Sequence, residues 1–225
     1  MAIVAFHMSE KENAMNFCRA NILVLLGKTE VQPMKLPPTR ELLQFQAAKL
    51  IKLGLTNDDL LSRLPNPKLI SPGFSLLVPS LPVSPDFVEL MTLVEIVRGK
   101  RGWCVKEFKS HMIKDRIHDP GVPTLLVDVD PGSERQDLPQ MECLPPIREQ
   151  GRLALNAWRN FIMIVLHPAV LARGVYLEDG GSQYGQEGSL VFCTMDEYPV
   201  LEVASALVVH QWCTIPTCKE AIPLT

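Results

Sequence analysis

The chain has 225 residues, 47% of them hydrophobic, and carries a formal net charge of −3 with a pI of about 6.0. This length and composition are sufficient for a buried core, either in one generous domain or in two small ones. The weak negative charge excludes a general attraction to polyanions, so we expect no nucleic-acid partner.

The first 36 residues mix a charged stretch with a short apolar patch, and they predict an N-terminal extension or a helical arm. Residues 37–225 are expected to form a single domain. Thr39 is a suitable N-cap for a helix that Gly54 should end, and the preceding prolines cannot belong to that helix. The expected apolar stripe of this helix consists of Leu42, Leu43, Phe45, Leu50 and Leu53.

Shorter elements are predicted next. Residues 58–64 form a second helix with acids in its first turn and prolines after its end. Residues 74–80 indicate a buried strand between Pro and Gly turns. Residues 84–97 begin like a helix but drift into β-branched residues, so the state of residues 93–97 stays open. Residues 99–103 indicate a hairpin-type connection.

The strongest predicted strand spans residues 122–130. Alternation along this strand sends Asp128 and Asp130 to one side and Val127 and Val129 to the other. The two aspartates are therefore expected to share a face at the end of the strand.

Helices are predicted over residues 138–152 and 153–174 from their apolar period. Antiparallel strands follow in residues 175–181, 189–194 and 198–212. Helices dominate the first part of the chain and strands the last, without a repeated strand-helix-strand alternation. The expected fold class is α+β, with a helical N-terminal part packed on a mainly antiparallel sheet in a single domain.

No segment resembles a secretory or membrane signal. The longest apolar run near the N-terminus, residues 22–26, is shorter than a signal core of roughly 7–15 residues or a membrane span of about 20. The six cysteines are scattered without a disulfide framework, so we expect reduced thiols. We therefore expect a cytoplasmic protein without a membrane partner.

Charge is distributed unevenly along the chain. Residues 1–127 carry 16 Lys and Arg against 12 Asp and Glu, whereas residues 128–225 carry 6 against 13. The two halves could meet within the fold or between chains. Solvated faces of ordinary surface elements are the favoured interpretation, because runs of charge mainly mark exposure.

Four short motifs stand out: TLLVDVDPGSE at residues 124–134, LPPIREQGRLALN at 144–156, HPAVL at 167–171 and HQWCTIPTC at 210–218. With them the chain resembles, from about residue 36 to residue 218, a family of uncharacterised bacterial proteins, a domain of unknown function common in actinobacteria. The resemblance implies no activity. Residues 179–209 depart from the family, because they are acidic where a more basic, tryptophan-containing hairpin is expected.

The carboxylates after the strongest strand are the first candidate site. Asp128 and Asp130, joined by Glu134, could hold a hard cation such as Mg²⁺ in a metal-dependent hydrolase-like enzyme. The calcium-loop pattern fails, because its sixth position is Ser133 and its twelfth is Pro139. We favour a simpler interpretation, a Pro-Gly turn that Asp130 caps, with Asp128 solvated or paired with a basic residue.

Arg152 and His167 are further candidates for a polar site. Arg152 could bind an anion, but pairing with a carboxylate such as Glu149 or Asp130 is favoured. His167 precedes Pro168, which could expose the imidazole, yet a catalytic base also needs a partner and a pocket. A packed or surface histidine is therefore the favoured interpretation.

His210, Cys213 and Cys218 form a weak zinc candidate. Zinc favours such ligands, but structural sites use closely spaced pairs, and this spacing is loose. Core thiols are favoured, because buried cysteine commonly behaves as a small hydrophobe. Dinucleotide, phosphate-loop and nucleophile-elbow motifs do not occur in the sequence, so we expect no cofactor.

Two functions remain. We favour a non-enzymatic binding or assembly module with an unknown protein partner or self-association, because the charge is asymmetric and no catalytic motif stands out. The alternative is the metal-dependent hydrolase-like enzyme that uses Asp128, Asp130 and Glu134.

Overall fold

The first helix begins and ends where its capping residues predict. In the computed structural model, α2 spans Arg40–Lys52, the Thr39 hydroxyl accepts a hydrogen bond from the Leu42 amide, and Gly54 has a φ of +71°. The predicted apolar stripe is only partly correct. Phe45 is 52% exposed, because the buried face of α2 follows the 3.6-residue period. The residues on that buried face are Leu43, Gln46, Ala47 and Leu50.

The structure describes residues 39–71, 73–97, 100–117, 120–132, 138–171, 176–208 and 213–225. These residues belong to one compact unit with the bounds Pro33–Thr225. The predicted extension or arm over residues 1–36 lies outside the described residues and stays a prediction.

A three-stranded antiparallel sheet has β6 (Thr124–Val127) in its centre. β6 pairs with β1 (Leu76–Val78) on one side and with β14 (Glu220–Pro223) on the other. Both predicted strands are present, and all residues of β1 and β6 are buried. β6 ends before Asp128, which has a φ of +51°, so the predicted alternation does not continue to the aspartates.

Residues 84–97, whose last part had no definite prediction, contain both a helix and a strand. α4 spans Phe87–Met91, and β2 (Glu95–Val97) then pairs antiparallel with β3 (Lys100–Arg101). A hairpin is therefore present, but residues 100, 101 and 103 of the predicted connection 99–103 are strand residues. The remaining short elements of this half of the chain are α3 (Asp59–Ser62), the 3₁₀ turns Pro67–Leu69 and Ser110–Met112, β4 (Trp103–Cys104) and β5 (Ile113–Asp115).

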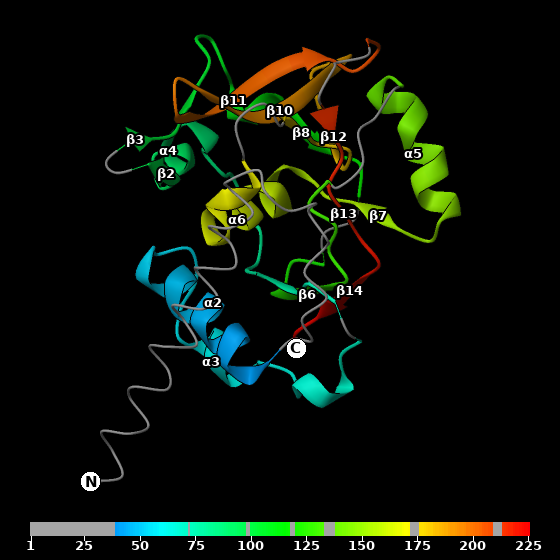
Figure 1. The fold of residues 1–225 in the computed structure, drawn as a ribbon. Helices are drawn as coiled ribbons and strands as arrows, with labels where there is room; N and C mark the ends of the chain where they lie inside the picture. The colour runs from blue at the N-terminus through cyan, green and yellow to red at the C-terminus, as the bar shows by residue number, and fades with distance from the viewer. Residues whose placement is uncertain are drawn as a thin grey trace, which may run out of the picture. The chain divides into compact units, whose positions relative to one another are not determined.

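The larger sheet is mainly antiparallel and comes mostly from the last part of the chain. Its order is β12-β8-β10-β11-β4, and β9 pairs with both β10 and β5. Among the pairings of its described residues, only β12–β8 and β11–β4 are parallel. Figure 1 shows β10 and β11 as the long strands of this sheet. The bounds are β8 Tyr176–Glu178, β9 Ser182–Tyr184, β10 Gly188–Met195, β11 Tyr198–Ser205 and β12 Cys213–Thr214.

The second long helix is shorter than predicted. α5 spans Gln140–Glu149, but residues 153–154 form a strand, β7 (Leu153–Ala154), and α6 covers only Ala157–Leu166. The Asn156 side chain accepts a hydrogen bond from the Arg159 amide and so starts α6. Pro168 opens a separate 3₁₀ turn, so the predicted single helix from 153 to 174 is wrong.

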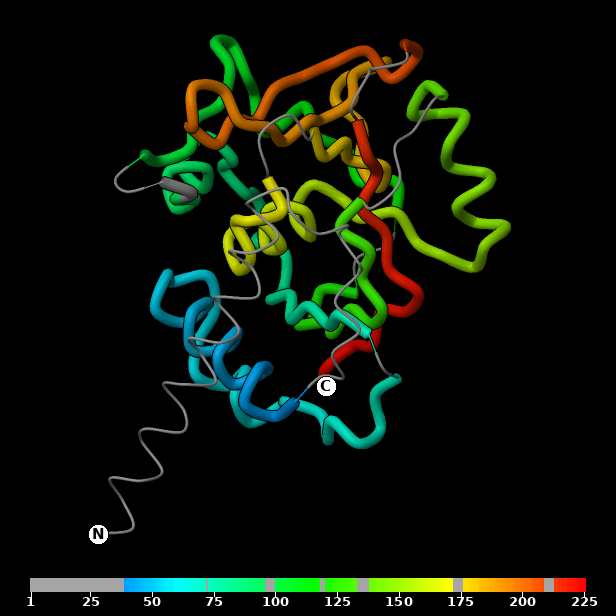
Figure 2. The backbone as a smooth tube through the Cα atoms, in the orientation of Figure 1, coloured from blue at the N-terminus to red at the C-terminus, as the bar shows by residue number. Residues whose placement is uncertain are grey.

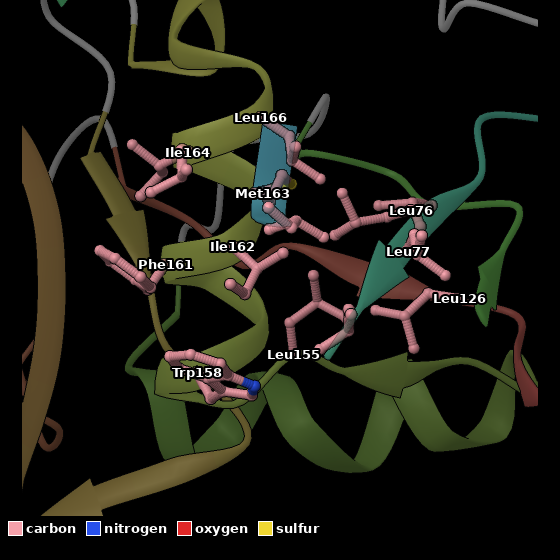
Figure 3. Packing of buried hydrophobic residues seen from close by; sticks show 14 of the residues in the cluster. Leu76, Leu77, Leu126, Leu155, Trp158, Phe161, Ile162, Met163, Ile164 and Leu166 are labelled. Atoms are coloured by element: carbon pink, nitrogen blue, oxygen red, sulfur yellow. The ribbon is translucent and has the colours of Figure 1, made fainter. Parts of the chain in front are cut away.

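α6 lies at the centre of the core. All ten of its residues are buried, as expected of a helix that is apolar on most sides. It lies between the larger sheet and the β6 sheet in Figure 1. Figure 3 shows side chains of this helix beside Leu76 and Leu77 of β1 and Leu126 of β6.

The last segment of the described chain joins three distant regions. β12 pairs with β8, β13 (Thr217–Cys218) pairs with β7, and β14 pairs with β6. Figure 2 shows this segment in red as it follows these strands. Helices and sheets together make the described part of the chain α+β, as predicted from the order of its elements.

Candidate functional site

Arg152 and Asp128 form an ion pair at the end of β6. Arg152 Nη1 lies 3.2 Å from Asp128 Oδ2, and Nη2 donates to the Asp128 carbonyl at 2.6 Å. Arg152 Nε also donates to the Thr217 hydroxyl at 2.7 Å. The structure therefore brings two of the predicted site residues together, but the partner of Arg152 is Asp128 instead of Glu149 or Asp130.

Asp130 caps the turn, as the favoured interpretation predicted. Its Oδ1 accepts a hydrogen bond from the Gly132 amide at 2.9 Å, and its backbone forms an antiparallel bridge with Thr217. Thr217 thus connects Asp130 with Arg152. These contacts give both aspartates a structural role at the junction of β6 and β13.

The metal-site alternative stays a prediction. Glu134 lies outside the described residues, and Asp128 and Asp130 already bind Arg152 and Gly132. Within the ranges that the structure describes, no group of three or more His, Cys, Asp and Glu side chains could hold a metal ion.

His167 is packed in the core. Its Nε2 lies 3.3 Å from Gln46 Nε2. Its ring packs edge-on against the Phe74 ring, and the two ring centroids lie 4.9 Å apart. Burial, together with the charge of Lys49, lowers the pKa of His167 to about 4. The imidazole is therefore neutral near pH 7 and Pro168 does not expose it, because only 7% of the residue is accessible.

The two described cysteines of the zinc candidate have different surroundings. Burial raises the pKa of Cys213 to about 12, and the negative charge of Glu178 contributes to this increase. Burial also raises the pKa of Cys218 to about 11, although Arg159 opposes this shift. Both are protonated thiols near pH 7 and hence poor ligands and nucleophiles. His210 lies outside the described residues, so the zinc site stays a prediction.

The structure also contains a cleft of about 680 Å³, and none of these residues lines it. One wall is the proline-rich segment 81–88, and the other is the segment 108–115. The N-terminal residues of α6, Ala157 and Trp158, complete its lining. Apolar and polar atoms contribute nearly equal surface to the lining, and its apolar residues include Val83, Val88 and Ile113.

Asp86 lines the cleft, and hydrogen bonds fix the position of its carboxylate. Asp86 Oδ1 accepts hydrogen bonds from the Val88 amide at 3.0 Å and from the Ser110 hydroxyl at 3.1 Å. Ser110 Oγ in turn accepts from the Phe87 amide at 2.9 Å. Asp86 and Ser110 therefore cap α4 and fasten one wall of the cleft to the other.

Hydrogen bonds also fix the carboxylate of Asp115, another lining residue. Its Oδ1 accepts from the Ser182 hydroxyl at 2.7 Å, and its Oδ2 accepts from Asn156 Nδ2 at 2.9 Å. Ser182 Oγ accepts from the Ala157 amide at 2.9 Å. The carboxylate thus supports the N-terminus of α6, where the helix dipole favours a negative charge.

Lys109 and His111 are the basic side chains that line the cleft. Both are exposed, and neither side chain has a hydrogen-bond or ion-pair partner within the described ranges. They lie on the same wall, next to Phe108 and Ile113. The cleft therefore combines an apolar lining with cationic or hydrogen-bonding groups that a ligand can reach.

Sequence reasoning missed this cleft. Its walls are at least 20 residues apart along the chain, so no local spacing marks them. The available signal was the basic, aromatic-containing segment around Phe108 and Lys109, which lies in the most basic region of the sequence.

Comparison of the sequence with family models, curated proteins and solved structures finds no match. The resemblance to the actinobacterial family therefore stays a prediction. Among the described helices, none has both the length and the apolar character to cross a membrane.

Proposed function

We propose that the protein is a non-enzymatic binding module whose cleft takes an amphipathic anion, a molecule with an apolar body and a carboxylate or sulfonate group. The observation that carries this proposal is that Lys109 and His111, beside apolar walls, have no side-chain partner among the described residues. The proposal thus specifies the class of ligand that the binding module favoured by the sequence would bind.

The size of the cleft suits a small molecule. Ligand sites commonly measure roughly 300–1,000 Å³ and combine an apolar lining with a few polar groups. The cleft of about 680 Å³ lies within this range. An aromatic or aliphatic body would gain affinity by removing the walls around Val88 and Ile113 from water.

The charge of the available groups favours an anion. Asp86 and Asp115 line the cleft, but each already accepts two side-chain or backbone hydrogen bonds. These neutral donors leave the two carboxylates charged but occupy their acceptor positions. Lys109 has no such partner within the described residues, so its ammonium group is available to donate hydrogen bonds to the anionic group of a ligand.

The contacts of the polar groups favour binding over catalysis. The Ser110 hydroxyl is engaged with Asp86 and with the Phe87 amide, so it is held as a capping group. A nucleophilic serine needs an adjacent base that can take its proton, usually a histidine. In this cleft the carboxylates stabilise helix ends instead.

The test uses anilinonaphthalene sulfonate, whose fluorescence rises in apolar sites. We expect saturable binding at one site. Lys109→Glu should weaken it about tenfold, because the variant replaces an attracting charge with a repelling one. Val88→Glu, on the exposed face of the same cleft, should weaken it similarly.

Lys106→Glu is the matched control, since Lys106 is an exposed lysine outside the cleft lining. The affinity of this variant for anilinonaphthalene sulfonate should stay within about twofold of the affinity of the original chain. Equal binding by the Lys106 and Lys109 variants, with no loss in Val88→Glu, would refute the proposed site.

A cytoplasmic location is part of the proposal. The five described cysteines are free and four of them are buried, and such thiols persist in a reducing compartment. An assembly role, through a protein partner or self-association, remains a separate prediction.

A further inference from the structure

We propose that Arg116, Arg148 and Arg152 form a second binding site, separate from the cleft, for a phosphoryl group. The three arginines line one small pocket of about 40 Å³. Arg116 follows β5, Arg148 lies in the last turn of α5, and Arg152 immediately precedes β7. Three elements therefore bring three guanidinium groups to one place.

Most donors of these arginines have no acceptor among the residues that the structure describes. A guanidinium group carries five N–H donors. Arg116 uses one of them for Gln140 Oε1, at 3.3 Å, and Arg152 uses three for Asp128 and Thr217. Arg148 has no side-chain acceptor within the described ranges. A tetrahedral oxyanion offers acceptors in several directions and can satisfy donors from different sides.

The positive charges in the pocket are only partly offset. Asp128 pairs with Arg152. Asp179 is the carboxyl group whose negative charge would raise the pKa of Arg116. Asp179, however, is buried, and burial raises its pKa to about 8, so it is mostly protonated near pH 7. Burial lowers the pKa of Arg116, and the charge of Arg148 lowers it further. A bound anion would relieve this repulsion between like charges.

The size of the pocket selects a small group. One water molecule needs roughly 10–15 Å³ of such space, so about 40 Å³ accepts a head group of a few heavy atoms. Leu144, Ile147 and Leu153 line the pocket beside the arginines. Their apolar surface reduces competition from water and strengthens each charge-assisted hydrogen bond.

Calorimetric titration of the full chain with inorganic phosphate tests the site. We expect saturable binding that Arg148→Gln weakens about tenfold, because Arg148 supplies free donors and holds no other described residue in place. Arg101→Gln, which removes an exposed arginine elsewhere, should stay within about twofold. Arg148→Lys should be intermediate, since it keeps the charge but loses the forked donors.

Two outcomes would overturn the site: no binding of phosphate, or equal affinity of the Arg101 and Arg148 variants. A parallel titration with phenyl phosphate identifies the source of the phosphoryl group. Tighter binding of the ester supports a phosphorylated organic ligand, whereas tighter binding of inorganic phosphate supports the free ion. Because Arg148 is exposed, its variants should fold and keep the measurement decisive.

Discussion

Arg152 holds Asp128 by two groups at once, the carboxylate at 3.2 Å and the backbone carbonyl at 2.6 Å. Asp128 has a left-handed φ of +51°, a conformation that costs energy in a residue other than glycine. The arginine therefore stabilises a strained corner where β6 leads into the turn that Asp130 caps.

Arg152→Ala should lower the free energy of unfolding by about 2–3 kcal/mol, because the change removes three hydrogen bonds from a mostly buried guanidinium. Urea unfolding measures this loss. Asp128→Asn should cost less, since the bond to the backbone carbonyl remains. Equal losses in the two variants would show that the carboxylate alone matters.

Asp130→Ala should lower stability by about 1 kcal/mol through loss of the bond to the Gly132 amide. If the residue serves only the turn, Mg²⁺, Mn²⁺ and Ca²⁺ should neither bind in calorimetric titrations nor change this loss. Cation binding that disappears in the variant would instead support the metal-dependent alternative.

Asp179→Asn should make stability less dependent on pH. Burial raises the pKa of Asp179 from 3.8 to about 8, with the charge of Asp115 adding to the shift. Between these values the folded state keeps a proton that the unfolded state releases, so this group makes stability fall as pH rises from about 4 to 8.

Asparagine can accept the same backbone hydrogen bonds from Gly181 and Ser182 without titrating. The stability of the variant relative to the original chain should therefore increase steadily across that pH range in urea unfolding. A constant difference would mean that Asp179 is ionised in the folded state throughout.

Gly132→Ala should cost at least about 3 kcal/mol, because an added Cβ would lie 2.2 Å from Thr214 Oγ1 at a φ of +96°. Gly54→Ala is the control, since Gly54 also has a positive φ but nothing lies within 4 Å of its added Cβ. It should cost about 1 kcal/mol, the strain alone. Thermal unfolding compares the two, and equal losses would contradict the close contact.

Local chemistry determined much of what the sequence predicted correctly. The Thr39 cap, the Asp130 turn and the paired strands in the last part of the chain depend on residues a few positions apart. Side-chain hydrogen bonds over two or three residues and the two-residue alternation of strands act before tertiary packing is fixed. The α+β class followed from the order of these local elements.

Only the tertiary structure decided which distant residues meet. The length of α6, the burial of His167 and the pairing of Arg152 with Asp128 all depend on contacts across many residues of chain. The cleft and the arginine pocket each lie between segments that the sequence separates. Such contacts form because burial of α6 positions the surrounding sheets, and this is a property of the whole core.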